Sequence, residues 1–149
     1  MPLKTTIFLA LVLTAVALAP SAAHLFELPN KIGLSQDQYF IVQNIYRGWA
    51  LLGSVVIAAI LINLLLVYLL WAQLPARWFA LLAFVCVLGG LIVFFTWTYP
   101  ANVATDNWTS VPQDWRALRV QWEYSHAANA VLTFVAFCSL TLAAITARY

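Results

Sequence analysis

The residues best suited to acid–base or metal chemistry are the two histidines of the sequence, His24 and His126. Each has a glutamate three residues away, in opposite order: Glu27 follows His24, and Glu123 precedes His126. Residues three apart on a helix share one face, so each glutamate is expected to orient its histidine and make it more basic. Histidine exchanges protons near neutral pH, and the pattern therefore predicts an acid–base site.

Further polar residues occur at the same predicted membrane depth. Arg47 lies at the start of the second apolar segment, Asn102 follows the third, and Arg119 precedes Glu123 by one helical turn. Guanidinium and amide N–H groups can stabilise a developing oxyanion. Arg47, Asn102 and Arg119 are therefore candidate catalytic residues beside the two His–Glu pairs.

Aromatic side chains gather at this same end of the predicted bundle. Tryptophan is typical of membrane interfaces, and an aromatic belt accounts for most of these residues. The sharper hypothesis is that several of them line a pocket for a flat apolar ligand. The candidate ligand-binding residues are Tyr46, Trp49, Trp108, Trp115 and Trp122.

A metal site is an alternative use of the same residues. The candidate ligands of a single metal ion are His24, His126, Glu27 and Glu123. Di-metal bundles take Glu-x-x-His from two helices and a carboxylate from each of the others, and this chain falls short of that set because one motif is reversed. Bis-histidine haem ligation is a further alternative. A cofactor-free acid–base site is another alternative, and it uses every polar group named. In the last alternative these residues have only a structural role and form a hydrogen-bonded cluster that joins the helix ends.

The elements that must position these residues are membrane helices. Of the 149 residues, 64% are hydrophobic and only 8% are charged, against about 25% charged in soluble proteins. A helix needs about 20 mostly apolar residues to cross the bilayer, and the segments that qualify are 5–23, 45–71, 78–97 and 125–147. The expected fold is all-α, a single domain over residues 1–149 that forms an antiparallel four-helix bundle. The lipid bilayer is the expected partner, together with a small apolar molecule, and a net charge of +2 is too small to suggest nucleic acid.

The first apolar segment has an alternative interpretation. Lys4, an apolar run and the sequence Pro20-Ser21-Ala22-Ala23 are typical of a cleavable signal peptide. Cleavage after Ala23 would make His24 an N-terminal residue whose amine and ring can chelate copper. A membrane helix is the favoured interpretation because cleavage would leave an odd number of spans.

The connections between segments predict the topology. Residues 72–77 form a tight hairpin that lies on the side of both termini, and the two longer connections lie on the opposite side, the polar face. The hairpin side holds three basic residues and no acid, namely Lys4, Arg77 and Arg148, whereas the polar face holds four basic residues that have acids nearby. Unopposed basic residues favour cytoplasmic termini, with the polar face outside.

Two further positions can be predicted from local sequence. Asp114, two residues after Pro112, is a plausible N-cap for a last helix that begins at Trp115, before the membrane. Asn63 lies near the middle of the second segment and is expected to form an interhelical hydrogen bond.

Several polar blocks together carry a resemblance to a known family. They are HLFELPNK at 24–31, YRGW at 46–49, YPAN at 99–102 with NW at 107–108, and WEYSH at 122–126. Over its full length the chain resembles a family of small four-helix membrane proteins of unsettled function that includes the anthrone oxygenases, which insert oxygen into polycyclic aromatic phenols without a known cofactor.

The resemblance implies an oxidoreductase-like protein acting on a small aromatic or quinone-like molecule. The positions that match polar residues of the oxygenase members are His24, Asn102, Trp122 and His126. The chain departs from them at Ala127-Ala128-Asn129, where an arginine is expected shortly after the histidine. That departure bears on the aromatic polyketide substrate and leaves the fold unaffected. The alternative function is a non-catalytic membrane subunit or ligand-binding module in which the His–Glu pairs are structural.

Overall fold

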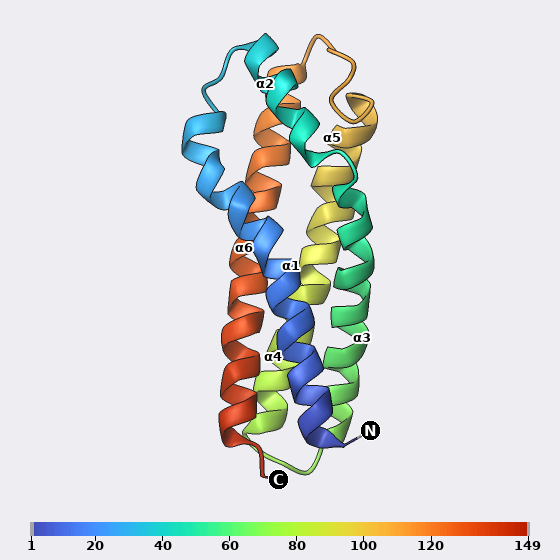
Figure 1. Ribbon diagram of the computed structural model, residues 1–149, viewed down its shortest axis with the longest axis vertical. Coiled ribbons are helices and arrows are strands. Elements are labelled where there is room, and N and C mark those ends of the chain that lie inside the picture. The colour runs from blue at the N-terminus through green and yellow to red at the C-terminus, as the bar shows by residue number, and fades with distance from the viewer. Residues whose placement is uncertain (1, 149) are drawn as a thin grey trace.

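The computed structural model describes residues 2–148, which are almost entirely helical. Four helical rods are long and apolar enough to cross a membrane: Leu3–Lys31, Trp49–Leu69, Ala76–Ala104 and Trp115–Thr146. They pack side by side in one elongated bundle (Figure 1). The predicted all-α fold with four membrane helices is confirmed, and the chain is an integral, multi-pass membrane protein.

Shorter elements complete the rods and cover one end of the bundle. In chain order the elements are α1 (Leu3–Lys31), α2 (Gln36–Gln43), η1 (Asn44–Tyr46), η2 (Trp49–Leu52), α3 (Gly53–Leu69), α4 (Ala76–Val93), the π-helical turn η3 (Phe94–Thr98), α5 (Tyr99–Ala104) and α6 (Trp115–Thr146). Helix α2 and the connection between α5 and α6 lie at the upper end in Figure 1.

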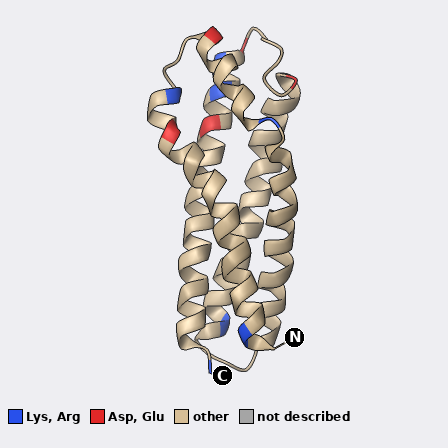
Figure 2. Ribbon diagram, in the orientation of Figure 1, with Lys and Arg blue, Asp and Glu red and all other residues tan. Residues whose placement is uncertain are grey.

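Both chain ends and the α3–α4 connection lie together at the opposite end, as the topology predicts (Figure 1). Charge is divided in the same way: the ribbon shows only Lys and Arg near the termini, and both signs at the other end (Figure 2). The middle of the bundle carries no charged residue over the described part of the chain. We call the two ends the hairpin end and the polar end.

The first predicted span is too short. The sequence predicted an end near Ala23, but α1 continues through Pro20 and Pro29 to Lys31. Proline removes one backbone donor from the helix ladder, and beside Pro20 the Ser21 hydroxyl donates to the Ala17 carbonyl at 3.1 Å. The extra two turns are polar, so hydropathy could not reveal them, and they carry His24 into the body of the molecule.

The next two predicted spans also have different ends. Residues 45–52 are 3-10 turns rather than α-helix, and Gly48 links them with a φ of 88°, a left-handed conformation that glycine adopts without strain. The third rod extends past Trp97 to Ala104 because the π turn η3 lets the helix continue into α5. By contrast, the predicted start of the last helix at Trp115 is confirmed, although Asp114 makes no side-chain cap bond.

Two packed clusters hold the bundle together. Along the spans the buried positions are largely alanine, and Ala10, Ala59 and Ala83 are each 0% exposed. Small residues let membrane helices approach closely, which favours packing in the absence of a hydrophobic driving force. The second cluster lies at the polar end and is aromatic, comprising Tyr39, Ala101, Trp108, Trp115 and Trp122. This second cluster surrounds the candidate site.

Candidate functional site

The two histidines meet inside the polar end although 102 positions of sequence separate them. His24 on α1 and His126 on α6 stack with ring centroids 4.1 Å apart and an angle of 30° between the planes. His24 is only 5% exposed. Because α1 and α6 run antiparallel and pack along their length, the late part of one and the early part of the other reach the same level, as the sequence indicated.

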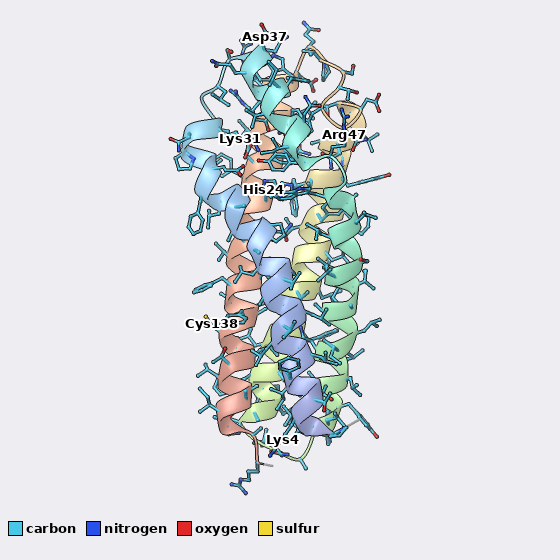
Figure 3. The ribbon with its side chains drawn as sticks, viewed as in Figure 1. Lys4, His24, Lys31, Asp37, Arg47 and Cys138 are labelled. Atoms are coloured by element: carbon cyan, nitrogen blue, oxygen red, sulfur yellow. The ribbon has the colours of Figure 1, made fainter. Side chains whose placement is uncertain are left out.

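Aromatic rings enclose this histidine pair. The indole of Trp122 stands edge-on to His126 at 4.1 Å and to His24 at 5.0 Å. The Tyr46 and Trp49 rings approach His24 at 4.5 and 5.6 Å. The pair is therefore walled by flat, largely apolar faces, and Figure 3 shows His24 inside the bundle below α2.

A buried lysine is the centre of a second group beside the histidines. Lys31 at the end of α1 is 3% exposed, and its Nζ lies 3.1 Å from Glu123 Oε1 and 3.8 Å from Glu27 Oε2. It donates a hydrogen bond of 2.7 Å to Tyr46 Oη, which in turn donates to Glu27. Lys31 also stands over the Trp122 ring at 4.5 Å. This ammonium is satisfied by charge, by hydrogen bonding and by aromatic faces at once.

Glu123 is the most deeply buried acid of the site. It is 0% exposed and accepts a 2.8 Å hydrogen bond from Tyr39 Oη as well as the contact from Lys31. These bonds join α6 to α2 and to α1. A buried charge is tolerated only with such partners, so the carboxylate explains why the three helix segments come together here.

The predicted pairing of each glutamate with its neighbouring histidine is wrong. Among the described residues no hydrogen bond or ion pair joins Glu27 to His24 or Glu123 to His126; both glutamates turn to Lys31 and to tyrosines instead. The spacing of three residues permits the pairing, but a full positive charge within reach is a stronger partner for a carboxylate than a neutral imidazole.

Two tyrosines of the connection between α1 and α3 serve as donors to these carboxylates. Burial raises the pKa of the Tyr39 phenol above its ordinary value, and the nearby Glu123 carboxylate raises it further. Burial likewise raises the pKa of Tyr46, together with its hydrogen bond to Glu27. Both phenols therefore stay protonated and keep donating at neutral and moderately alkaline pH.

The remaining polar candidates lie around this centre in different ways. Asn102 accepts from two indoles through one oxygen, at 2.8 Å from Trp122 Nε1 and 3.3 Å from Trp108 Nε1. Arg119 donates to the Leu34 carbonyl at 2.7 Å. Arg47 is exposed and donates to Asn44 at 3.2 Å.

Asn102, Arg119 and Arg47 therefore lie at different distances from the histidine pair. Trp122 contacts both histidines directly, and Asn102 is joined to them through its hydrogen bond with Trp122. Arg119 stacks 4.8 Å from the Trp115 ring and ties α6 to the turn before α2. Arg47 lies on the outer surface of the polar end (Figure 3).

Two residues at the centre of the group were not among the sequence candidates: Lys31 and Tyr39. Lys31 was assigned to a connecting loop because the apolar run ends before it. A signal for it does exist, since His24, Glu27 and Lys31 are spaced by three and four residues, as on one helix face. Tyr39 carries no comparable signal, because only the fold of the connection brings it to Glu123.

The geometry does not provide the proposed three-ligand metal site. Within residues 2–148 no group of three or more His, Cys, Asp or Glu side chains lies close enough to hold a metal ion. Bis-histidine haem ligation needs two ring nitrogens that face each other across a porphyrin, whereas His24 and His126 stack ring on ring at 4.1 Å. The donor set in this arrangement fits neither group.

Three polar atoms of the candidate site residues are buried without a hydrogen-bond partner. They are Nδ1 of His24, Oε2 of Glu123 and Nε of Arg119. Leaving such an atom unpaired costs about 1–3 kcal/mol, so each would gain from a hydrogen bond to a hydroxyl or another small polar group. Chemically, the site offers an imidazole pair, a carboxylate acceptor, an ammonium and flat aromatic walls.

The comparisons with known proteins give no relative. No protein-family model, curated protein or solved structure matches the chain. The site must therefore be interpreted from its own geometry.

Proposed function

We propose that this integral membrane protein binds a small flat aromatic molecule, phenol-like or quinone-like, at its polar end and abstracts a proton from it, in an oxygenase-like oxidation. The observation that carries the proposal is the stacked pair of the buried His24 and the partly buried His126, which come from two helices and are walled by aromatic rings. An apolar planar ligand suits such walls, and the bilayer is a ready source of apolar molecules.

The histidine pair supplies the base. Two imidazolium ions stacked at this distance would repel each other, so the pair holds at most one added proton and keeps an imidazole free to accept another. The unpaired Nδ1 of His24 and Oε2 of Glu123 are the acceptors open to a ligand hydroxyl or acidic C–H. The Asn102 amide and the Lys31 ammonium, which both contact Trp122, are the donors that we assign to the resulting oxyanion.

The resemblance to anthrone oxygenases supplies the reaction class. An activated ring CH2 loses a proton to the base, and the carbanion is oxidised by O2. One oxygen atom becomes a new carbonyl, and the other leaves as water with the two hydrogens of the CH2. Dioxygen is the oxidant, so the balance CH2 + O2 → C=O + H2O needs no further electron donor.

A specific observation also supports the second candidate, a non-catalytic membrane subunit or binding module. The Lys31–Glu123 pair with Tyr39 and Tyr46 ties α1, the connection after it, and α6 together. In this alternative the whole polar group is a lock between helix ends, and the histidines are part of its packing.

Oxidation of anthrone itself separates the two candidates. We expect detergent-purified protein to accelerate anthrone-dependent O2 uptake, and His126→Ala or His24→Ala to lower the rate by about 100-fold, the usual contribution of a general base. Asp37→Asn, an exposed change at the same end, is the control. Full activity in both histidine variants would refute the mechanism.

Two further measurements on the same samples complete the test. If the wild type shows no activity and neither anthrone nor a quinone such as menadione raises its melting temperature, while the histidine variants melt lower, the structural alternative is supported. Metal analysis with an absorption spectrum tests the remaining alternative: near-stoichiometric metal or haem lost in both variants would make the histidines ligands.

A further inference from the structure

We propose that a groove on the outer face of α3, together with Arg77 at its end, binds one anionic phospholipid from the membrane leaflet at the hairpin end. In this site an acyl chain lies in the groove and the phosphate meets the guanidinium. The inference goes beyond the proposed function and does not depend on it, because it concerns the end of the molecule opposite the histidine pair.

Helix α3 has an inner face toward the bundle and an outer face toward lipid. The inner face includes Asn63 and Leu66, which are both 0% exposed. The Asn63 side chain has no hydrogen-bond partner among the described residues, so the interhelical bond predicted for it is not formed. The outer face carries large apolar side chains at the spacing of one helix side, namely Leu61, Leu64 and Tyr68, which are 62%, 50% and 74% exposed.

An open groove of about 490 Å³ runs along this outer face. Leu61 lies eight residues before the end of α3 at Leu69, so the groove extends about 12 Å along the helix at 1.5 Å per residue. One leaflet contributes about 15 Å to the hydrocarbon core, and the groove therefore has nearly the depth of one leaflet. The lining is almost wholly apolar, as an acyl chain requires, and consists of Leu61, Leu64, Leu65, Val67, Tyr68 and Trp71.

Trp71 joins the groove to a cation. The Arg77 guanidinium lies 4.7 Å from the centre of the Trp71 ring and 4.9 Å from that of Trp78. It also donates a hydrogen bond of 3.0 Å to the Trp71 carbonyl. Trp71 and Trp78 are 66% and 56% exposed, and exposed tryptophans are typical of the membrane interface. These contacts hold the guanidinium at the end of the groove, at the level where lipid phosphates lie.

The charge at this end favours an anionic headgroup. The hairpin end holds Lys4, Arg77 and Arg148 and no acidic side chain among residues 2–148, and the ribbon near the termini shows only basic residues (Figure 2). Arg77 pairs with no described carboxylate. A guanidinium presents a planar fork of N–H donors that matches the oxygens of a phosphate. Phosphatidylglycerol brings a net negative charge to this fork, whereas phosphatidylcholine also carries a cation of its own.

A second copy of the chain is a poorer occupant of this groove. In a symmetric dimer within one membrane, both copies present the same surface at the same level. The partner would therefore bring its own basic hairpin end beside Arg77, and like charges would oppose each other. A phospholipid brings the opposite charge and an apolar chain together.

Native mass spectrometry of the full protein tests the proposal, with dioleoyl phosphatidylglycerol and dioleoyl phosphatidylcholine as probes. We expect the first phosphatidylglycerol to bind about fivefold more tightly than the first phosphatidylcholine, the usual effect of one basic side chain near an anionic lipid. Arg77→Gln should abolish this preference, and Arg77→Lys, which keeps the charge, should retain most of it. Arg116→Gln is the matched control, because Arg116 makes a similar contact with a tryptophan, at 5.0 Å from the Trp115 ring, but at the polar end.

A bulky substitution tests the groove separately from the charge. Leu64→Trp fills part of the groove and should weaken the binding of both lipids by about fourfold for each methylene that it displaces. The preference for phosphatidylglycerol should persist, because Arg77 is unchanged. Leu142→Trp is the control on the outer face of α6, where Leu142 is 44% exposed and lies four residues before the end of its helix.

Each of the following outcomes overturns the proposal. Equal affinity of the wild type for both lipids means that the hairpin end does not select anionic headgroups. A preference that survives in Arg77→Gln places the phosphate elsewhere, and a loss as large in Arg77→Lys as in Arg77→Gln means that Arg77 acts by packing. Unchanged binding in Leu64→Trp means that the acyl chain does not use the groove. A dimer that persists without lipid and is lost in Leu64→Trp assigns the groove to a second copy.

Discussion

Lys31 and Glu123 are each almost completely removed from solvent, and each is the nearest full counter-charge of the other. A charge transferred to a low-dielectric interior loses several kcal/mol of hydration, and a close partner recovers much of this loss. Tyr39, Tyr46 and Trp122 supply the remaining contacts. The pair is thus stable as a unit, and the removal of either member alone leaves a buried charge without compensation.

We therefore expect Lys31→Met and Glu123→Gln to destabilise the protein by about 3–5 kcal/mol each, the usual cost of breaking a buried pair. The double variant should be less destabilised than the sum of the two, because no uncompensated charge remains. Unfolding in detergent micelles with increasing SDS measures these free energies. Asp37→Asn is the control, and additive losses would show that the two charges do not depend on each other.

The buried phenol of Tyr39 and the partly buried phenol of Tyr46 predict an effect of alkaline pH. An ordinary tyrosine has a pKa of 10.0, and burial raises the pKa of Tyr39 and Tyr46 above this value in the folded state. The folded protein holds these protons more tightly than the unfolded chain does. The stabilisation from the protonated phenols is therefore complete below pH 10 and falls as the pH rises above it.

Tyrosinate absorbance during an alkaline titration provides the measurement. We expect Tyr39→Phe and Tyr46→Phe to remove a late-titrating phenol from the profile, and Tyr39→Phe to cost about 1–3 kcal/mol because Glu123 loses a donor. If neither variant changes the late part of the titration, these phenols do not titrate above the ordinary range.

Residue types and spacing in the sequence predicted that His24 and His126 meet, because helix periodicity and an antiparallel topology fix their level. The same information could not predict their partners. The partner of a carboxylate depends on which donors lie within reach in the folded protein. Lys31 lies within reach of Glu123 only because α1 extends two turns beyond its apolar run. The role of Tyr39 depends on the path of a connection that has no periodic pattern.

At the level of helices, hydropathy located the four spans but not their ends. A span is fixed by the thickness of the bilayer, whereas an end at the polar face depends on individual tertiary contacts. The π turn at Phe94–Thr98 is an example: it continues the third rod and brings the buried Thr98 hydroxyl to 2.7 Å from Ser125 on α6. π turns carry no reliable sequence signal and are frequent near functional sites.

Gly90 on α4 leaves space for a side chain of α6 just below this turn. A Cβ added to Gly90 would lie 2.7 Å from Asn129 Oδ1, whereas one added to the adjacent Gly89 would meet only Leu132 at an ordinary 3.8 Å. We expect Gly90→Ala to destabilise the bundle by about 1–3 kcal/mol through overpacking. Gly89→Ala is the matched control and should be nearly neutral in the same SDS unfolding assay.

A second substitution tests the cause of that effect. Asn129→Ala shortens the side chain that Gly90→Ala would displace, so the double variant should be less destabilised than Gly90→Ala alone. Equal destabilisation in the presence and absence of Asn129 would assign the effect to the helix backbone rather than to the contact between α4 and α6.

The molecule as a whole is polarised along its long axis. One end holds the aromatic cluster and the buried ion pair, and the other holds both termini, the α3–α4 connection and unopposed basic residues (Figures 1 and 2). Basic residues are retained on the cytoplasmic side of membrane proteins. We therefore expect the hairpin end to face the cytoplasm and the polar end, with the candidate site, to face the opposite compartment.

Cysteine labelling in whole cells determines this orientation. In a background of Cys86→Ala and Cys138→Ala, Gln73→Cys marks the hairpin end and Ser110→Cys marks the polar end. A membrane-impermeant maleimide should label Ser110→Cys in intact cells and Gln73→Cys only after lysis. The reverse pattern would mean that the basic residues do not set the orientation and that the site draws its ligand from the cytoplasmic side. Labelling of both in intact cells would contradict the bundle topology itself, because these two positions lie at opposite ends of rods long enough to cross the bilayer.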